Sequence, residues 1–377
     1  MTISLTDPST SLWAAVPFQF WSVVFFILGC IVGSFLNVCI HRLPLDESIV
    51  SPPSHCPHCK YSIPWYLNIP LVTWLYLGGK CKNCGARISI RYFLVELLTG
   101  AGFLGCWVAF GHQSTALTLI YCMVLGGLIV ATAIDVEHLI IPDGITFGGA
   151  IAGVVCSVLL PRLQGENTLL GGLGHSLLGL AVGGGVIYAI VRGGKLAFGR
   201  QRVTLPAETK IVFGETAVHL PDKDVPFEEL FYRKSDVIVL EAKTVELADR
   251  CYRDVRVRLG PEKLEIGEDE FSSEETPHLE VVCSEIVLPR EAMGLGDAKL
   301  MAAIGAFLGW QGVLFTLTVS TLVGSIYGIA MILLRKQMWS GRLYFGPFLA
   351  LAAAVWIFDG PALVNSYQQL MQRLLGR

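Results

Sequence analysis

Residues 115–138 read TALTLIYCMVLGGLIVATAIDVEH, in which twenty residues without a charged side chain end at Asp135. About 20 apolar residues in a helix cross the hydrocarbon core of a bilayer, which is about 30 Å thick. The stretch therefore predicts a membrane-spanning helix with a carboxylate at its end. Similar windows recur along the chain, and we expect eight spans, at residues 18–40, 92–111, 115–134, 144–162, 169–192, 294–310, 312–334 and 343–359. The expected fold class is an all-α polytopic membrane protein with about eight transmembrane helices.

The composition agrees with a membrane protein that carries one soluble insert. Of the 377 residues, 53% are hydrophobic and 16% are charged, and the mean hydropathy is +0.57. An ordinary soluble domain has about 25% charged residues, which argues against a purely soluble enzyme. Charge is concentrated in residues 201–290, which hold 20 of the 31 acidic and 12 of the 28 basic residues. The net charge of −3 averages two unlike parts and does not suggest a nucleic-acid partner.

The charged segment has the sequence pattern of a small β domain. Residues 236–240, 255–259 and 279–283 are alternating or β-branched runs, and Gly260-Pro261 forms a turn signal between strand candidates. We therefore expect a mostly β soluble insert within residues 193–293.

The distribution of basic residues predicts how the chain crosses the bilayer. Residues 41–91 contain six bases and two acids, whereas residues 1–17 contain no base. Cytoplasmic loops are enriched in Lys and Arg, so the N-terminus is expected outside and the loops 41–91, 135–143, 193–293 and 335–342 inside. The expected divisions are an outer tail (1–17), the first span (18–40), a cytoplasmic zinc-binding loop (41–91), spans two to five (92–192), the insert (193–293), and spans six to eight with the C-terminal tail (294–377).

Pairs of glycines four residues apart predict close helix packing. Helices in lipid associate through close backbone approach, because burial in hydrocarbon supplies no hydrophobic drive between them. The pairs are Gly29/Gly33, Gly149/Gly153, Gly179/Gly183, Gly305/Gly309 and Gly324/Gly328.

Four cysteines have the spacing of a metal site. Cys56-x2-Cys59 and Cys81-x2-Cys84 are separated by 21 residues. Two such knuckles supply the four thiolates of a closed, tetrahedral, structural zinc site. Disulfides are the alternative, and a loop that faces the reducing cytosol favours metal over disulfides. His55 and His58 are substitute ligands that four cysteines make unnecessary.

Two aspartates at span ends are candidate catalytic residues. Asp135 closes the third span and Asp297 opens the sixth, with two crossings between them, so both emerge on the cytoplasmic side and can meet. Two neighbouring carboxyl groups do not both ionise readily, and such a pair can supply one base and one acid for hydrolysis of a peptide bond. The pattern does not assign which aspartate is which. Gly294 and Gly296 leave room for a substrate backbone beside Asp297.

Each aspartate also has a plainer interpretation. Asp135 alone is typical of a carboxylate at a helix end, and Asp297 alone is typical of an acid stabilised by the positive end of a helix dipole. The two positions together, with a matching topology, favour catalysis.

Six ordered motifs make the chain similar to a known family. They are Gly33-Ser34-Phe35-Leu36-Asn37-Val38 with Arg42-Leu43-Pro44; the four cysteines; Asn68-Ile69-Pro70 and Ile88-Ser89-Ile90-Arg91-Tyr92 with Glu96; Asp135 to Pro142-Asp143; Glu291 to Leu300, which contains Gly294-Leu295-Gly296-Asp297; and Phe345-Gly346-Pro347-Phe348. Together they resemble the bacterial type IV prepilin peptidases of pilus and type II secretion systems.

The resemblance implies a Gly-x-Gly-Asp intramembrane aspartyl protease of the bacterial inner membrane, whose active site faces the cytoplasm and whose catalytic pair is Asp135 and Asp297. It implies cleavage of the leader from prepilins or pseudopilins, and methylation of the new N-terminus with S-adenosylmethionine. Residues for that cofactor are not indicated by the sequence. Glu137, Asp143 and Lys299 match neighbours of the catalytic pair and are expected to supply supporting charge and helix capping.

Two other functions stay open at this point. A transporter or channel could use the same carboxylates for protons or cations, and an inactive family member could serve as a scaffold. The insert departs from the short link of common family members, and could bind the pilus or secretion assembly machinery, attract basic leaders or gate the site.

Overall fold

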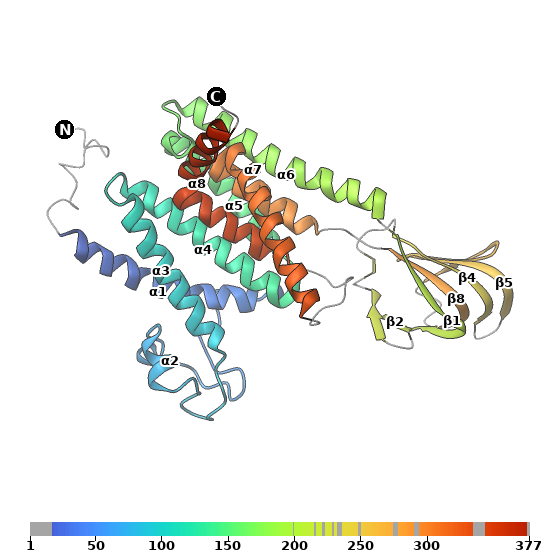
Figure 1. The fold of residues 1–377 in the computed structure, drawn as a ribbon. Coiled ribbons are helices and arrows are strands. Elements are labelled where there is room, and N and C mark those ends of the chain that lie inside the picture. The colour runs from blue at the N-terminus through green and yellow to red at the C-terminus, as the bar shows by residue number, and fades with distance from the viewer. Residues whose placement is uncertain are drawn as a thin grey trace. The chain divides into compact units, whose positions relative to one another are not determined.

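The computed structural model describes residues 17–374 except 199, 215, 221–222, 228–229, 232–235, 248–249, 274–277, 290–293 and 335–343. The N-terminal tail, the motif residues Glu291 to Met293 and the bases expected in the loop 335–342 lie outside the described residues. The chain divides into two compact units (Figure 1): an insert of residues 189–294, and a helical unit that contains the rest.

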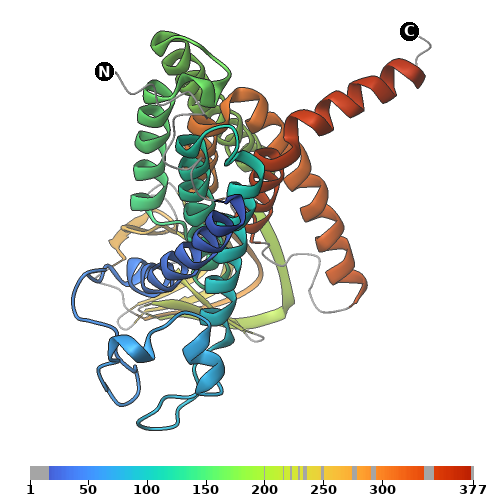
Figure 2. The same cartoon turned by 90° about the vertical axis from the view of Figure 1, so that its left-hand side faces the viewer.

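The helical unit is built from long apolar helices. Their bounds are α1 Phe18–Arg42, α2 Val72–Tyr76, α3 Ile90–Phe110, α4 Thr115–His138, α5 Asp143–Leu159, α6 Leu169–Phe198, α7 Leu295–Leu333 and α8 Gly346–Leu374. Helices α1 and α3 pack side by side, and α7 packs against both α5 and α8 (Figures 1 and 2). The loop between α1 and α3 holds the short helix α2 and the four cysteines of the two Cys-x2-Cys motifs, all of which are free thiols.

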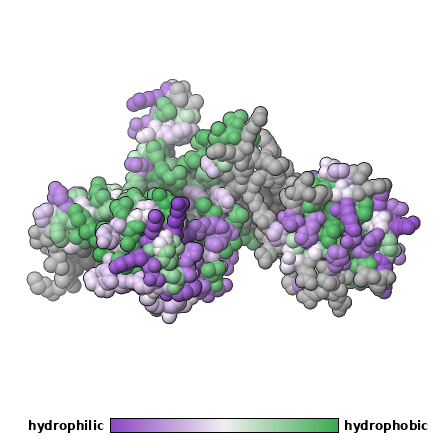
Figure 3. Space-filling view, turned by 90° about the horizontal axis from the view of Figure 1, so that it is seen from below, coloured by the Kyte–Doolittle hydropathy of each residue, from purple (hydrophilic) through white to green (hydrophobic). Residues whose placement is uncertain are grey.

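Six of the described helices are long and apolar enough to cross a membrane. They are α1, α3, α4, α6, α7 and α8. Helix α5, expected to span the bilayer over residues 144–162, has only 17 residues, because the chain leaves the helix after Leu159 and continues into a 3-10 turn at Pro161. Many large apolar side chains on these helices face outward, among them Ile151 at 67% exposure and Leu322 at 62%. Apolar side chains cover much of the helical unit in the view of Figure 3, as expected of a surface that lipid covers.

Helix α7 corresponds to two of the expected spans. Gly309 inside it has the non-helical angles φ 70° and ψ 176°. A Cβ on Gly305 would lie 2.9 Å from Cγ2 of Val313, although eight residues of continuous helix would separate these positions by about 12 Å. The chain therefore turns back at Gly309, close to the boundary at residues 310–312 that the sequence predicts.

The described residues of the insert form an eight-stranded antiparallel sheet, which confirms the expectation of a mostly β domain. The strands are β1 Arg200–Phe213, β2 Ala217–Leu220, β3 Lys223–Pro226, β4 Ile238–Glu246, β5 Cys251–Leu259, β6 Lys263–Ile266, β7 Asp269–Ser272 and β8 Leu279–Pro289, in the order β3-β2-β1-β8-β4-β5-β6-β7. Buried side chains alternate with more exposed ones along most of β4 and β8, and residues such as Ile211, Leu240 and Val281 form a buried core. Side chains that point away from this core form ion pairs, such as that of Lys210 with Glu280.

Glycines allow several helices of the helical unit to touch through their backbones. A Cβ on Gly179 would lie 2.1 Å from the carbonyl oxygen of Gly305, and a Cβ on Gly29 would lie 2.7 Å from that of Thr99. These distances are shorter than any ordinary contact, so the side chain must be absent there. A Cβ on Gly328 would meet no atom within 4 Å, so the glycine pattern over-predicts close packing at that position.

We predict that Gly179→Ala destabilises the protein by about 1–3 kcal/mol, because the added methyl group must push α6 away from α7. Gly185→Ala is the matched control on the same helix, where a Cβ would meet no atom within 4 Å. Since alanine favours a helix over glycine, the control should be neutral or slightly stabilising. Thermal unfolding in detergent measures both, and equal midpoints for the two variants would show that α6 and α7 do not approach as closely as described.

Candidate active site and metal centre

Asp135 lies in the last turn of α4 and is fixed by the start of α8. Its side chain is buried, and its Oδ2 accepts a hydrogen bond from the backbone N–H of Gly346 at 3.0 Å. Gly346 is the first residue of α8, so the carboxylate also lies at the positive end of that helix. A Cβ on Gly346 would lie 2.7 Å from Oδ2, so only glycine fits against this carboxylate. The sequence motif around Gly346 did not assign it this function.

Asp297 is buried in the first turn of α7. Beside it, Gly296 packs on Ile141 in the connection between α4 and α5, and a Cβ on Gly296 would lie 3.3 Å from Cβ of Ile141. One turn of α7 further on, Lys299 Nζ donates to Oδ1 of Asp143 at 2.5 Å. These two contacts join the segment that follows Asp135 to the segment that carries Asp297.

The other two residues predicted to support the catalytic pair, Glu137 and Gly294, differ in their surroundings. Glu137 forms an ion pair with Arg91 at the start of α3. The side chain of Arg91 is 22% exposed and that of Glu137 is 38% exposed, so the pair is only partly in water. Gly294 is exposed and directly precedes α7.

Arg91 connects the cysteine loop to the helix that carries Asp135. It follows the loop at the N-terminus of α3, where Ser89 Oγ accepts a hydrogen bond from its backbone N–H at 3.2 Å. Its partner Glu137 is only two residues beyond Asp135. The sequence identified Arg91 as part of a motif without a role, because a contact between residues so far apart in the chain leaves no local signal.

The four predicted metal ligands form one cluster. The sulfur atoms of Cys56, Cys59, Cys81 and Cys84 all lie within 4.8 Å of one another, and all four cysteines are free. The Sγ atoms of Cys56 and Cys84 are 3.8 Å apart, and those of Cys59 and Cys81 are 4.0 Å apart. Four sulfurs at about 2.3 Å from a tetrahedral zinc ion would be about 3.8 Å apart, so the donor set fits such an ion.

The two knuckles share one backbone conformation. In the first, the N–H of Lys60 donates to the carbonyl of Cys56 and the N–H of Cys56 donates to that of Tyr61. In the second, Gly85 donates to Cys81 and Cys81 donates to Ala86 in the same way. Lys60 and Gly85 both have a positive φ, 56° and 71°. Two equivalent turns therefore present their thiols to a common centre.

The thiols of the cluster need a cation to ionise together. A hydrogen bond from the Asn83 side chain helps to lower the pKa of Cys59 to about 6. The hydrogen bond with the backbone of Ala86 lowers the pKa of Cys84, but partial desolvation and the hydrogen bonds with the neighbouring thiols together outweigh it and raise this pKa to about 11. Since a metal ion removes the repulsion between thiolates, the cluster is suited to bind one.

Comparison with known proteins connects both halves of the helical unit to one enzyme family. Residues 27–110 match the family described as Bacterial Peptidase A24 N-terminal domain, and residues 279–329 match the Type IV leader peptidase family. The second match contains Asp297, and Asp135 lies outside both matches. No solved structure matches the chain.

Several curated relatives carry one name. The chain is 29% identical to the prepilin leader peptidase/N-methyltransferase of Aeromonas hydrophila, over 93% of this chain and 95% of that protein. It is 26% identical to the protein of that name from Pseudomonas aeruginosa, over 91% and 92%. Its identity to the Myxococcus xanthus protein is 45%, but that match covers only 40% of this chain and 44% of the relative.

We predict that the purified protein retains one metal ion per chain and that Cys59→Ser lowers the metal content at least twofold, because three thiolates hold the ion less tightly than four. Cys251→Ser is the matched control, since this exposed cysteine of β5 is not part of the cluster. Elemental analysis after dialysis measures the content. Equal metal in both variants, or none in the wild type, would contradict a four-thiolate site.

We also predict that Arg91→Glu and Glu137→Arg each destabilise the protein, and that the double exchange restores part of the loss. The expected coupling energy is about 1 kcal/mol, since both side chains are partly exposed. The pair Arg202–Glu285, with side chains 78% and 43% exposed, is the control and should show almost no coupling. A double-mutant cycle of unfolding free energies measures both pairs, and the same small coupling in each would rule out the link between α3 and α4.

Proposed function

Because the chain belongs to the type IV prepilin peptidase family, we propose that it is a membrane-embedded aspartyl endopeptidase that cleaves the leader peptide of type IV prepilins or pseudopilins. We propose further that it methylates the new N-terminus. The family matches and the names of the relatives support both activities.

The catalytic pair in this proposal is Asp135 and Asp297. The observation that supports it most is the pair of contacts Lys299–Asp143 and Gly296–Ile141, which tie the segments carrying the two aspartates to each other. Both carboxyl groups are buried at helix ends, Asp135 at 6% and Asp297 at 8% exposure. Burying a carboxylate at the end of a span costs free energy, so a buried carboxylate there is a candidate for a functional residue.

In the proposed reaction one carboxylate accepts a proton from a water molecule as its oxygen bonds to the scissile carbonyl carbon. The other carboxyl group gives its proton to the amide nitrogen, after which the carbon–nitrogen bond breaks. The products are a leader with a free carboxylate and a pilin with a free amine. Oδ2 of Asp135 is engaged by Gly346, so Oδ1 is the oxygen that we assign to proton transfer.

Supporting charges hold this pair in place. Lys299 links α7 to the start of α5 through Asp143, and Arg91 holds Glu137 at the end of α4. Proton transfer depends on the distance between the two carboxyl groups, so a scaffold that fixes both helix ends lowers the cost of reaching the reactive geometry.

The membrane arrangement that accompanies this activity has eight spans, with α5 and both halves of α7 crossing the bilayer, in the bacterial inner membrane. The N-terminus lies outside and the aspartates open to the cytoplasm. This orientation is supported by the six bases of residues 41–91. The insert then lies in the cytoplasm, where it would bind pilus or secretion assembly machinery, attract basic leaders or gate the site.

Two cofactors complete the proposal. The ion in the cysteine cluster is zinc, held by Cys56, Cys59, Cys81 and Cys84 as a structural site. When bound, S-adenosylmethionine supplies a methyl group, whose bond to sulfur breaks as the pilin amine bonds to it, leaving S-adenosylhomocysteine and one proton.

We predict that Asp135→Asn and Asp297→Asn each lower prepilin cleavage at least 100-fold, because each removes one member of the acid–base pair. Asp359→Asn is the matched control, an exposed aspartate of α8, and should cleave normally. Co-expression of each variant with a prepilin in membranes, followed by electrophoresis, measures cleavage.

Conservative variants separate the protease from a proton or cation pathway. A transport function would tolerate Asp297→Glu, whereas the peptidase requires the shorter side chain for its geometry. If both asparagine variants process the prepilin as well as the wild type, the assignment of the pair is wrong. Mass analysis of the mature N-terminus scores methylation separately.

A further inference from the structure

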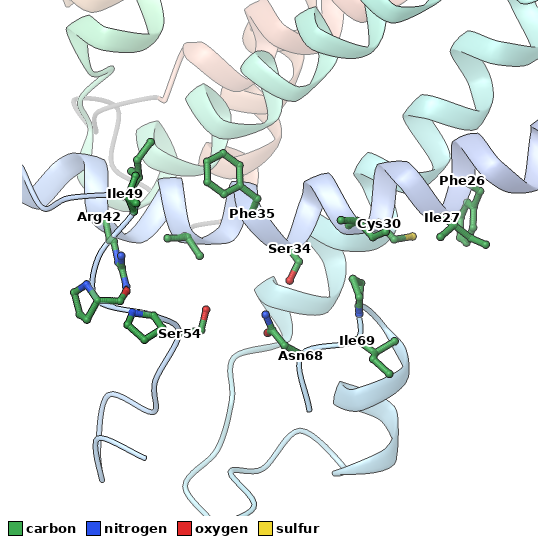
Figure 4. Close-up of a pocket in the computed structure, with 16 residues that line it drawn as sticks. Phe26, Ile27, Cys30, Ser34, Phe35, Arg42, Ile49, Ser54, Asn68 and Ile69 are labelled. Atoms are coloured by element: carbon green, nitrogen blue, oxygen red, sulfur yellow. The ribbon is translucent and has the colours of Figure 1, made fainter. Parts of the chain in front are cut away.

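A cavity of about 540 Å³ lies between α1 and the cysteine loop, apart from the aspartates (Figure 4). We call it the α1 cavity. Its α1 wall includes Cys30, Ile31 and Ser34, and its loop wall includes Ser54 and residues 68–70. The polar residues that line it belong to the motif segments 33–44 and 68–70 or lie next to the first cysteine knuckle. The proposed cleavage by the aspartate pair does not use these residues. Its volume is within the usual range of small-molecule sites, about 300–1,000 Å³.

The α1 cavity has apolar walls with polar groups set along them. The apolar part of its lining includes Cys30 and Ile31 of α1 and Ile69 and Pro70 of the loop. Figure 4 shows Ser34 pointing from α1 toward the loop, where Asn68 and Ser54 lie. A few convergent polar groups in an apolar cleft are typical of a site that fixes the orientation of a ligand.

One end of the α1 cavity is cationic. Arg42 is buried, and its guanidinium donates to the carbonyls of Ser48 at 2.8 Å and Pro52 at 2.6 Å. A guanidinium has five N–H groups, so these two bonds leave others for a ligand carboxylate. Cys30 and Arg42 are separated by about 18 Å of helix, so the cavity is elongated.

The loop wall is held in place from behind by a buried carboxylate. Oε2 of Glu96, on α3, accepts a hydrogen bond from the backbone N–H of Leu71 at 2.8 Å, and Ser34 also bonds to this carboxylate. Both walls are therefore fixed by Glu96, at Ser34 and at the residue that follows Pro70. Such support preorganises a binding site before the ligand arrives.

We propose that the α1 cavity is the S-adenosylmethionine site, in which Ser34, Ser54 and Asn68 bind the nucleoside and Arg42 faces the amino-acid carboxylate. This inference rests on the proposed function, which needs a second site because the aspartates account only for cleavage. The cavity lies mainly within residues 27–110, the part that matches a family description separate from the one containing Asp297.

The chemistry of the walls favours this ligand over a membrane lipid. An acyl chain along the α1 cavity would pass Asn68 and the remaining N–H groups of Arg42 without pairing them, which costs free energy in a water-poor site. A nucleoside joined to an amino acid has hydrogen-bonding atoms along its length and a carboxylate at one end. Two apolar residues of α1 that line the cavity are also exposed at the surface, Ile27 at 52% and Phe35 at 49%, and would let a substrate held in the membrane approach it.

The test is binding of radiolabelled S-adenosylmethionine to the full-length protein in lipid nanodiscs, with ultraviolet cross-linking to locate the label. Ile31→Trp should lower affinity at least 10-fold by filling the cavity, and Asn68→Ala should lower it about 5-fold by removing a hydrogen bond. Val23→Trp, on an equally exposed site of α1 outside the cavity, and Asn167→Ala, in an exposed loop, are the matched controls and should bind within twofold of wild type.

Prepilin cleavage is measured on the same samples, so that a failure of the proposed peptidase function can be distinguished from a failure of the proposed S-adenosylmethionine site. Weakened binding with normal cleavage and a cross-link in residues 26–70 supports the cavity as the site. Weakened binding without cleavage by the wild type also supports it and overturns the peptidase instead. Equal binding by all variants overturns the inference, as does a wild type that cleaves but binds no S-adenosylmethionine. Lipid that co-purifies with the wild type but not with Ile31→Trp, without any cofactor binding, would assign the cavity to lipid and overturn it too.

Discussion

The hydrocarbon of a membrane offers no hydrogen-bond partner to the backbone, so the chain must complete its hydrogen bonds within helices and leave polar chemistry to the helix ends. Both candidate catalytic aspartates follow this constraint, Asp135 in the last turn of α4 and Asp297 in the first turn of α7. The N–H of Gly346 belongs to the first turn of α8, whose amides have no partner within their own helix. Asp135 satisfies one of these amides, so the same hydrogen bond closes a helix end and orients a carboxylate.

Close packing without side chains follows from the same environment. Because lipid tails are as apolar as leucine, helices in a bilayer gain little from burying apolar side chains against one another, and they gain more from short backbone contacts. Gly179 and Gly305 bring α6 and α7 together at such a contact. Near it, the side-chain amide of Gln164 and the hydroxyls of Ser157 and Ser176 all donate to the carbonyl of Ala306. These bonds lie just before the turn at Gly309, where the helix leaves carbonyl oxygens without their usual partners.

The sequence predicted the elements that depend on local patterns. Apolar windows located the helices, and alternation located strands β4, β5 and β8 within the insert. The window 144–162 overestimated α5, because hydropathy continues through Leu160 while Pro161 stops the helix. Cysteine spacing found the four thiols that the structure brings together, since each knuckle is a local turn.

Contacts between distant segments could not be predicted in the same way. The bond from Gly346 to Asp135 joins residues 211 positions apart, and the ion pair of Arg91 with Glu137 joins residues 46 positions apart. Neither residue type nor spacing records which helix ends meet. The pairing of Asp143 with Lys299 was likewise visible only as two motif neighbours.

The position of the cysteine cluster indicates what a bound metal ion would do for this chain. The loop between α1 and α3 has little regular structure, and ordering it costs conformational entropy that its few buried apolar residues do not offset. Ser54 and Asn68, on one wall of the α1 cavity, bracket the first knuckle at Cys56 and Cys59. An ion that joined this knuckle to the second one would close the loop and so fix that wall, while Glu96 holds it from the helical side through the backbone of Leu71. A metal ion held there would therefore shape this wall of the α1 cavity without touching a ligand, which is the role expected of a site whose four coordination positions are all filled by protein.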